Sequence, residues 1–379
     1  MGKEPSQESE EVGVDSDAHP QPKRAKVEEN DDEREDEGVL SSVHVHPTNG
    51  TSPLGKALRV THFSTTIHKP RITYRIHHRM ATAIEAVGLQ VWPGALLLMD
   101  YILWKKQEFE SRVVVEIGAG TGLASIACAS VARKVFATDI AKLASADSTN
   151  DSLIHSDGGN ESTMESLGIL DLLSKNVAEN LGSDTSVCVV RELDLVDDAC
   201  PLFQFRKGPK EIDSPDSGFA FSSSDIHQFD SDCTVLLGAD IIYMDFVTFH
   251  FVRRLPVLLL KRVSAKGSAS SEKISRLSEE WESRILYLSL ERRIHFSKDE
   301  CRITAPAWDF FTRTVEAINL DMAGRVAEDG GDLDPLFPRV QIKLEQVIVD
   351  GMPQYFEYER VKELELWRVY LVQDALQEK

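Results

Sequence analysis

A glycine-rich segment after an apolar run is the part of this 379-residue chain whose residue types and spacing most directly indicate chemistry. Residues 113–117 read as a β-strand, and Gly118, Gly120 and Gly122 follow before a helical pattern begins. Glycines without a Cβ let the backbone turn tightly and approach a ligand closely. Leu123 stands where a dinucleotide fingerprint needs its third glycine, and no P-loop lysine follows. A smaller adenosyl ligand is therefore favoured over NAD or ATP.

Asp139 is the second residue that indicates a cofactor. It ends the next expected strand and lies 21 residues beyond Gly118. A carboxylate at this place accepts hydrogen bonds from both ribose hydroxyls of an adenosyl group. The glycines alone are compatible with a plain tight turn, but the loop and the acid together favour a cofactor site.

A third candidate for chemistry is the run from Ala239 to Tyr243, which follows another expected strand. The carboxyl ends of parallel strands form the edge where ligands bind in α/β folds. Asp240 and Tyr243 are the reactive side chains of this run. Their alternative interpretation is structural, with Asp240 capping the next helix and Tyr243 packing on it.

The elements that must position these residues alternate between strands and helices. Strands are expected at 113–117, 134–138, 187–193, 234–239, 284–290, 340–349 and 364–372. Helices are expected at 122–131, 170–181, 246–260 and 307–318. This alternation predicts an α/β fold, a seven-stranded mostly parallel sheet with helices on both faces and an antiparallel C-terminal strand.

The predicted domain spans 56–379, and residues 1–55 are predicted to be a disordered acidic tail because they contain few residues that could build a core. Surface insertions are expected at 144–166, 206–231 and 263–280. Pro22–Val27 is a basic island that resembles a nuclear localisation signal, with a chance charge cluster as the alternative. The nucleus is the expected compartment, and the cytoplasm is the second.

The formal net charge of −20 bears on the partner. Residues 1–40 carry 14 acidic and 5 basic side chains, so the rest of the chain is also acidic. A nucleic-acid binder needs a concentrated basic face, and no long basic run is present. A direct nucleic-acid partner is therefore not expected, whereas a basic protein segment would be attracted.

Cysteine spacing and hydropathy indicate which further kinds of site are not expected in this chain. The five cysteines show no CxxC spacing, so neither a metal site nor a disulfide framework is expected. The longest apolar runs fall short of the roughly 20 residues that span a bilayer, and no membrane contact is expected. The Met-Gly start with Ser6 matches the bare myristoylation pattern, which Lys3 and Glu4 weaken. A monomer is expected because no heptad stretch is present.

Together, these motifs resemble family 16 of the seven-β-strand methyltransferases, which are protein lysine methyltransferases. The resemblance covers about residues 72 to 375. It is carried by 91–95, 116–122, Asn176 with Asn180, 192–194 and 239–243. It implies a Rossmann-like fold, S-adenosylmethionine as cofactor and a lysine of another protein as substrate.

The resemblance also implies residue roles. Gly118, Gly120 and Gly122 would line the methionine end of the cofactor, Glu116 would brace the loop, Asp139 would hold the ribose, Asp194 would meet the adenine amine, and Trp92 and Ala239 would contact the cofactor pocket. Trp92 as a core residue and Asp194 as a helix cap are the structural alternatives. Leu195 departs from the tryptophan that many family members carry, so aromatic support of the adenine is in doubt there.

An acid followed after two residues by tyrosine is the family's hallmark, and Asp240 with Tyr243 matches it. The implied roles are orientation of the incoming amine by Asp240 and a channel wall formed by Tyr243. A methyltransferase for a small molecule or nucleic acid is one alternative, and a noncatalytic cofactor-binding scaffold is the other. The motif lacks the Pro-Pro pair typical of amino-directed nucleic-acid methyltransferases, which favours a protein substrate.

Overall fold

The computed structural model describes residues 39–41, 43, 58–141, 168–182, 184–203, 218–263, 281–297, 302–325 and 340–373. All of them belong to one compact unit, Gly38–Lys379. Most of the expected tail, the insertion at 144–166 and most of the insertion at 263–280 lie outside the described residues, as does Cys301.

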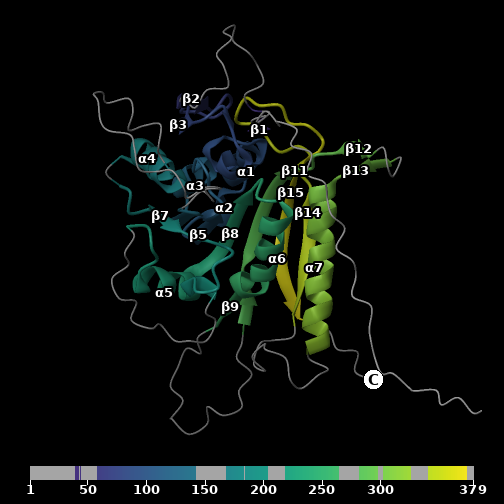
Figure 1. Cartoon of the computed structure of the whole chain (residues 1–379). Helices are drawn as coiled ribbons and strands as arrows, with labels where there is room; N and C mark the ends of the chain where they lie inside the picture. The colour runs from purple at the N-terminus through teal and green to yellow at the C-terminus, as the bar shows by residue number, and fades with distance from the viewer. Residues whose placement is uncertain are drawn as a thin grey trace, which may run out of the picture. The chain divides into compact units, whose positions relative to one another are not determined.

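A seven-stranded sheet forms the centre of this unit (Figure 1). Its order is β14 (Val340–Val347), β15 (Leu364–Gln373), β11 (Ile285–Glu291), β8 (Cys233–Ala239), β5 (Val113–Ile117), β6 (Lys134–Asp139) and β7 (Cys188–Glu192). The five strands from β11 to β7 pair in parallel, and β15 is antiparallel to both of its neighbours. The expected fold class is confirmed. The chain leaves β5 for β6 on one side and returns to β8 on the other, which places a topological switch point at β5.

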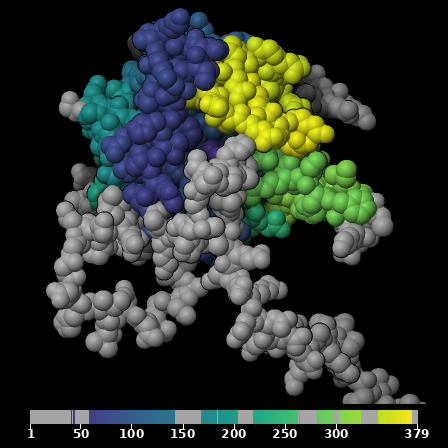
Figure 2. All heavy atoms as spheres, turned by 90° about the horizontal axis from the view of Figure 1, so that it is seen from above, coloured from purple at the N-terminus to yellow at the C-terminus, as the bar shows by residue number. Residues whose placement is uncertain are grey.

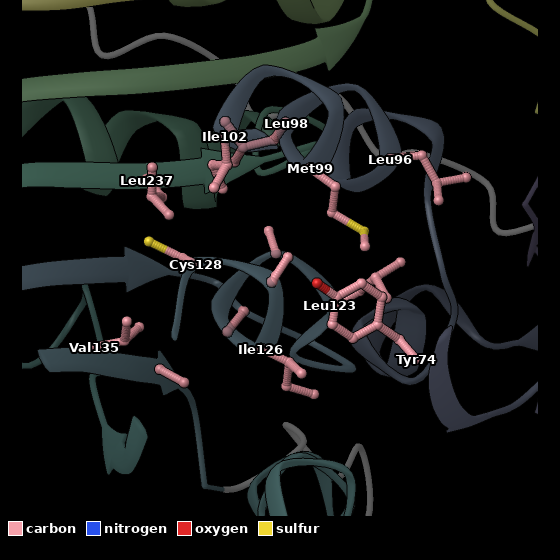
Figure 3. Packing of buried hydrophobic residues seen from close by; sticks show 14 of the residues in the cluster. Tyr74, Leu96, Leu98, Met99, Ile102, Leu123, Ile126, Cys128, Val135 and Leu237 are labelled. Carbon is pink, nitrogen blue, oxygen red and sulfur yellow. The ribbon is translucent and has the colours of Figure 1, made fainter. Parts of the chain in front are cut away.

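Two hydrophobic cores cover the two faces of the sheet, because a parallel sheet must be buried on both sides. One core is built with α1 (Pro93–Trp104), α3 (Leu123–Ala129) and α4 (Ile169–Leu181). Figure 3 shows Leu98 and Ile102 of α1 facing Leu237 of β8 in this core. The other core is built with α5 (Ser223–Asp232), α6 (Asp245–Leu259) and α7 (Pro306–Arg325).

Several elements were not predicted. They are the short strands β1 (Val39–Leu40) and β4 (Ala81–Thr82), the hairpin β2 (Arg59–Ser64) with β3 (Thr73–His78), the 3-10 helices η2 (Ile84–Leu89) and η3 (Pro201–Phe203), helices α1, α2 (Lys106–Phe109) and α5, and the pairs β9 (Leu260–Arg262) with β10 (Trp281–Ser283) and β12 (His295–Ser297) with β13 (Arg302–Thr304). Helix α5 lies in the segment expected to be a surface insertion. Its Phe229 is fully buried, and a Ser222–Asp225 capping box begins it.

Residues 39–41 also differ from the expected tail. Strand β1 pairs with β4, and Ser41 is buried. The Ser41 N–H donates to the Gln90 side chain at 2.9 Å, and the Ser41 hydroxyl donates to the Val91 carbonyl. This part of the chain is therefore attached to the segment between η2 and α1.

One helical stretch, Ile84–Trp104, is long and apolar enough to match the composition of a membrane span. It is 78% buried within the fold, as a core helix is. Such a stretch is weak evidence for a span.

Candidate active site

The glycine loop joins β5 to α3 at the switch point of the sheet. Gly118 has φ +66° and Gly120 has φ +53°, values in the left-handed region that glycine tolerates without strain. A Cβ on Gly118 would lie 2.7 Å from Ile241, and one on Gly120 would lie 2.8 Å from the Gly88 carbonyl oxygen. Glycine is therefore required at both positions by the close approach of the chain itself, in addition to any ligand.

Asp139 lies beside this loop and holds it. The Gly120 N–H donates to Oδ2 of Asp139 at 2.7 Å, and the Ile140 N–H donates to Oδ1 at 2.8 Å. Burial raises the pKa of Asp139 to about 6, although these two donors lower it. The Asp139 carbonyl also accepts from Leu193 N–H at 2.8 Å, which ties the ends of β6 and β7 together.

Glu116 fastens β5 to the helix that follows the loop. Its carboxylate accepts a hydrogen bond from the Ser125 hydroxyl in α3, and its carbonyl accepts one from Thr138 at 2.6 Å. The side chain is 1% exposed, and burial raises its pKa to about 8. Glu116 therefore supports the loop by joining β5 to α3 and β6, and it is largely protonated at neutral pH.

Asn176 and Asn180 attach α4 to the outer hairpin. Asn176 accepts from His77 N–H at 2.8 Å and donates to the carbonyls of His77 and Thr121, both at 2.9 Å. Asn180 makes the same pair of bonds with the backbone of Arg75, both at 2.8 Å. The two amides thus bond the edge of β3 as a strand would, and Asn176 links this edge to the glycine loop.

Asp240 follows β8 and joins three elements at the carboxyl edge of the sheet. Its Oδ2 accepts from Gly94 N–H in the first turn of α1 at 2.6 Å, and its Oδ1 accepts from Glu291 N–H after β11 at 3.0 Å. Its own N–H donates to the Ser289 carbonyl at 2.8 Å. The helix that this carboxylate caps is α1, and not the following helix α6 that the structural alternative suggested.

The backbone at Asp240 is strained, with φ +51°. Burial raises the pKa of Asp240, the N–H groups of Glu291 and Gly94 lower it, and so does the nearby guanidinium of Arg293. A carboxylate whose two oxygens are each held by a backbone donor has a fixed orientation. Asp240 as a whole residue is half-buried at this edge of the sheet.

Tyr243 and Trp92 are the aromatic residues of the predicted site. Tyr243 is half-buried, and burial together with the charges of Asp139 and Glu85 raises its pKa. It therefore lies within electrostatic reach of the glycine-loop acid. Trp92 donates its indole N–H to the Val87 carbonyl at 2.9 Å, and the Arg293 guanidinium carbon lies 4.8 Å from its ring centroid.

Asp194 and Ala239 lie at the carboxyl ends of β7 and β8, and both are half-buried. Asp194 accepts from Val196 N–H at 2.8 Å and so caps a turn, where a helix cap was the alternative. Ala239 is paired with Ser289 in the neighbouring strand β11.

The predicted residues thus fall into two groups at one edge of the sheet. Gly118, Gly120, Gly122, Glu116 and Asp139 form the loop and its supports, and Trp92, Asp240 and Tyr243 lie around the end of β8. Arg293 and the backbone donor of Gly94 were not predicted. Pro93-Gly94 could have signalled the start of a helix, since proline is favoured in the first turn, whereas nothing in the sequence distinguishes Arg293 from its neighbour Arg292.

These residues fit an adenosyl cofactor. Asp139 provides a carboxylate at the end of β6, and the adjacent loop presents glycine backbone without side chains. Tyr243 adds an aromatic surface near the same acid.

Comparison with known proteins finds a similarity that includes the glycine loop. The lysine methyltransferase family matches residues 73–155, which include the glycine loop and Asp139. The chain is similar to this family over that segment, and the cofactor that the similarity implies is S-adenosylmethionine.

Two relatives are similar to a larger part of the chain. Methyltransferase-like protein 22 of Mus musculus is 29% identical over 79% of this chain and 60% of its own length. The Homo sapiens protein of that name is 28% identical over 79% of this chain and 58% of its own. The motifs of the sequence predict a likeness to this protein within the family, and that prediction is confirmed. The chain covers about three fifths of these relatives.

A shorter match is with protein-lysine methyltransferase METTL21E of Bos taurus. It is 37% identical over 17% of this chain and 23% of its own length.

Proposed function

We propose that this chain transfers a methyl group from S-adenosylmethionine to the side-chain amine of a lysine in another protein. The proposal rests on the carboxylate of Asp240, which the backbone N–H groups of Gly94 and Glu291 hold at the carboxyl edge. It lies three residues before the half-buried Tyr243. The family match supports the reaction class.

The cofactor would be held by the glycine loop and its supports, together with Asp194, Ala239 and Trp92. Asp139 would accept hydrogen bonds from the ribose, Gly118, Gly120 and Gly122 would allow close approach, and Asp194 and Ala239 would border the adenosyl end from β7 and β8. Trp92 would pack against the pocket, and Glu116 would act through the loop. Bound there, S-adenosylmethionine supplies a methyl group on a positively charged sulfur.

The task of the remaining residues is to present an uncharged amine in line with that methyl group. A lysine amine has a pKa near ~10.4 in solution, so about 4 kcal/mol separates the abundant ammonium from the reactive amine at neutral pH. A carboxylate alone would stabilise the ammonium. Arg293 counters this effect because it places a positive charge near Asp240.

Asp240 therefore orients the amine and does not need to act as a simple base. Its backbone donors hold the carboxylate in one position, and the Tyr243 ring walls the channel and excludes water. The expected partner is a protein that presents a lysine in a basic segment, the expected compartment is the nucleus with the cytoplasm second, and the expected state is a monomer. The basic island Pro22–Val27 and the net charge of −20 support the compartment and the partner.

The test is to incubate the purified chain with methyl-labelled S-adenosylmethionine and a nuclear extract, and then to separate protein, nucleic acid and small molecules. Label in protein is expected. Asp240→Asn is preferred over Asp240→Ala, since it retains an acceptor for the α1 cap while removing the charge. This variant should bind cofactor and lose most of the label.

Label in nucleic acid or small molecules would identify a different substrate class. Cofactor binding without label in any fraction would support the scaffold alternative.

A further inference from the structure

Large aromatic side chains are mostly buried or half-buried in the described part of the chain. Of its phenylalanine, tyrosine and tryptophan residues, three are exposed: Phe246, Phe249 and Phe296, which are 58%, 43% and 62% exposed. Exposed aromatic side chains in a cluster indicate an interaction surface.

The three rings lie on the two segments that leave the sheet at Asp240. Phe246 and Phe249 are in the first turns of α6, which begins two residues after Tyr243. Phe296 is in β12, five residues after Glu291, whose N–H donates to Asp240. Both segments start at the carboxyl edge, beside the proposed lysine channel.

Each segment adds further apolar surface. In the hairpin, Phe296 is paired with Ile303, which is 68% exposed, and Ile294 precedes them at 44%. Figure 1 shows the hairpin of β12 and β13 beside the start of α7. In the view from above, the green residues of this region adjoin the yellow C-terminal residues (Figure 2).

The α6 side carries charges of both signs. Phe246 and Phe249 pack their rings on His250, with centroids 4.7 and 5.5 Å away. Asp245 begins α6 and is exposed. Asp198, in the exposed segment that also holds Val196 and Asp197, is paired with Arg254 of α6 at 2.6 Å. Apolar side chains therefore lie beside charged side chains of both signs.

We infer that these two segments dock the stretch of the protein substrate that carries the target lysine, and that this stretch contains large apolar residues. The docking surface consists of Val196, Phe246, Phe249, Ile294, Phe296 and Ile303. Two observations point to this occupant: both segments start next to Asp240 or its partner Glu291, and their exposed side chains are apolar. The inference rests on the proposed lysine methyltransferase function.

The experiment uses the full chain and, as probe, the nuclear-extract proteins that it labels with methyl-labelled S-adenosylmethionine. The double variant Phe246→Ser with Phe249→Ser and the single variant Phe296→Ser are compared with matched controls. The controls are Leu320→Ser and Ile348→Ser, whose side chains are 74% and 76% exposed on α7 and after β14. Exposed side chains such as these contribute little to folding, so all variants should be stable.

Each docking variant is expected to need about tenfold more extract protein for the same rate of labelling, with cofactor binding unchanged. Phe246→Leu should retain most of the activity because it keeps an apolar side chain. The control variants should label as the natural chain does.

Three outcomes would overturn the inference. Docking variants that label normally, or controls that fall equally, would show that the surface is not specific. Docking variants that lose cofactor binding would show that the side chains serve the fold. If the natural chain labels no protein at all, the proposed function fails and the docking surface fails with it.

Discussion

At the residue scale, the most informative side chains are carboxylates whose surroundings raise their pKa. Glu116 and Asp139 are both buried beside the glycine loop, and Asp240 is held at the edge of the sheet. The sequence predicted Asp139 and Asp240 from their positions at the ends of strands, and the resemblance to the methyltransferase family implied Glu116. It could not predict their hydrogen bonds to backbone donors, because these depend on residues distant in the chain, such as Gly94 and Glu291.

Arg293→Ala should move the pH dependence of methylation. Because Arg293 lowers the pKa of Asp240, its removal should raise that pKa, and activity should be lost at a higher pH as the solution is acidified. The rate should be measured across pH in Arg293→Ala and in Arg292→Ala. Arg292 is the matched control because its guanidinium bonds Glu365 at 2.9 Å. Equal profiles in the two variants would show that Arg293 does not act on Asp240.

Glu116→Gln should stabilise the cofactor-free protein in alkaline solution. The pKa of Glu116 rises from 4.5 to about 8 on folding, so its contribution to stability is fully present below pH 4.5 and is lost as the pH rises through 8. Glutamine does not ionise and retains an acceptor for Ser125. The variant's gain in the free energy of unfolding should approach roughly 5 kcal/mol well above pH 8, measured by urea denaturation. The raised pKa is contradicted if the variant and the natural chain differ by the same free energy of unfolding in acidic and in alkaline solution.

At the element scale, the strands of the central sheet were predictable because each is a short apolar run. Strand β5 is buried at all five positions and was predicted with its observed bounds. Helix α1 was missed although it is central to the fold, since it is apolar on all sides and has no helical periodicity to detect. The hairpin β2–β3 was missed because it is held by side chains of α4, which pattern alone does not reveal.

Asn176→Ala should destabilise the fold more than Asn180→Ala. Asn176 is fully buried, and its removal leaves a backbone N–H and two carbonyls without their partner. A loss of about 3 kcal/mol in the free energy of unfolding is expected, against about 1 kcal/mol for the more exposed Asn180. Chemical denaturation of both variants measures the difference. Equal losses would mean that the hydrogen bonds from Asn176 to β3 and the loop stabilise the fold no more than those of Asn180.

At the scale of the whole molecule, the compact unit that contains the sheet begins at Gly38. The sequence predicted an acidic tail, but its expected end at residue 55 passes over Val39–Ser41, which pair with β4 and the segment before α1. The difference arises because a two-residue strand and one buried serine leave no recognisable pattern. Net charge and composition are averages over many residues, so they carry no signal for so short an attachment.

Removal of residues 1–37 should leave the melting temperature and methylation unchanged, whereas removal of residues 1–43 should lower the melting temperature. The longer deletion takes away β1 and the bonds of Ser41 to Gln90 and Val91. Thermal unfolding of the two truncated chains measures this difference. A loss of stability already in the shorter deletion would place part of the folded unit before residue 38.

The central claim is that the methyl group arrives on lysine, and tandem mass spectrometry of the labelled protein tests it most directly. The proteins labelled by the natural chain and those incubated with Asp240→Asn should be digested and sequenced side by side. The account predicts methylated lysine side chains that are present with the natural chain and absent with the variant. Methyl groups on another residue type, or methyl-lysine made equally well by Asp240→Asn, would contradict it.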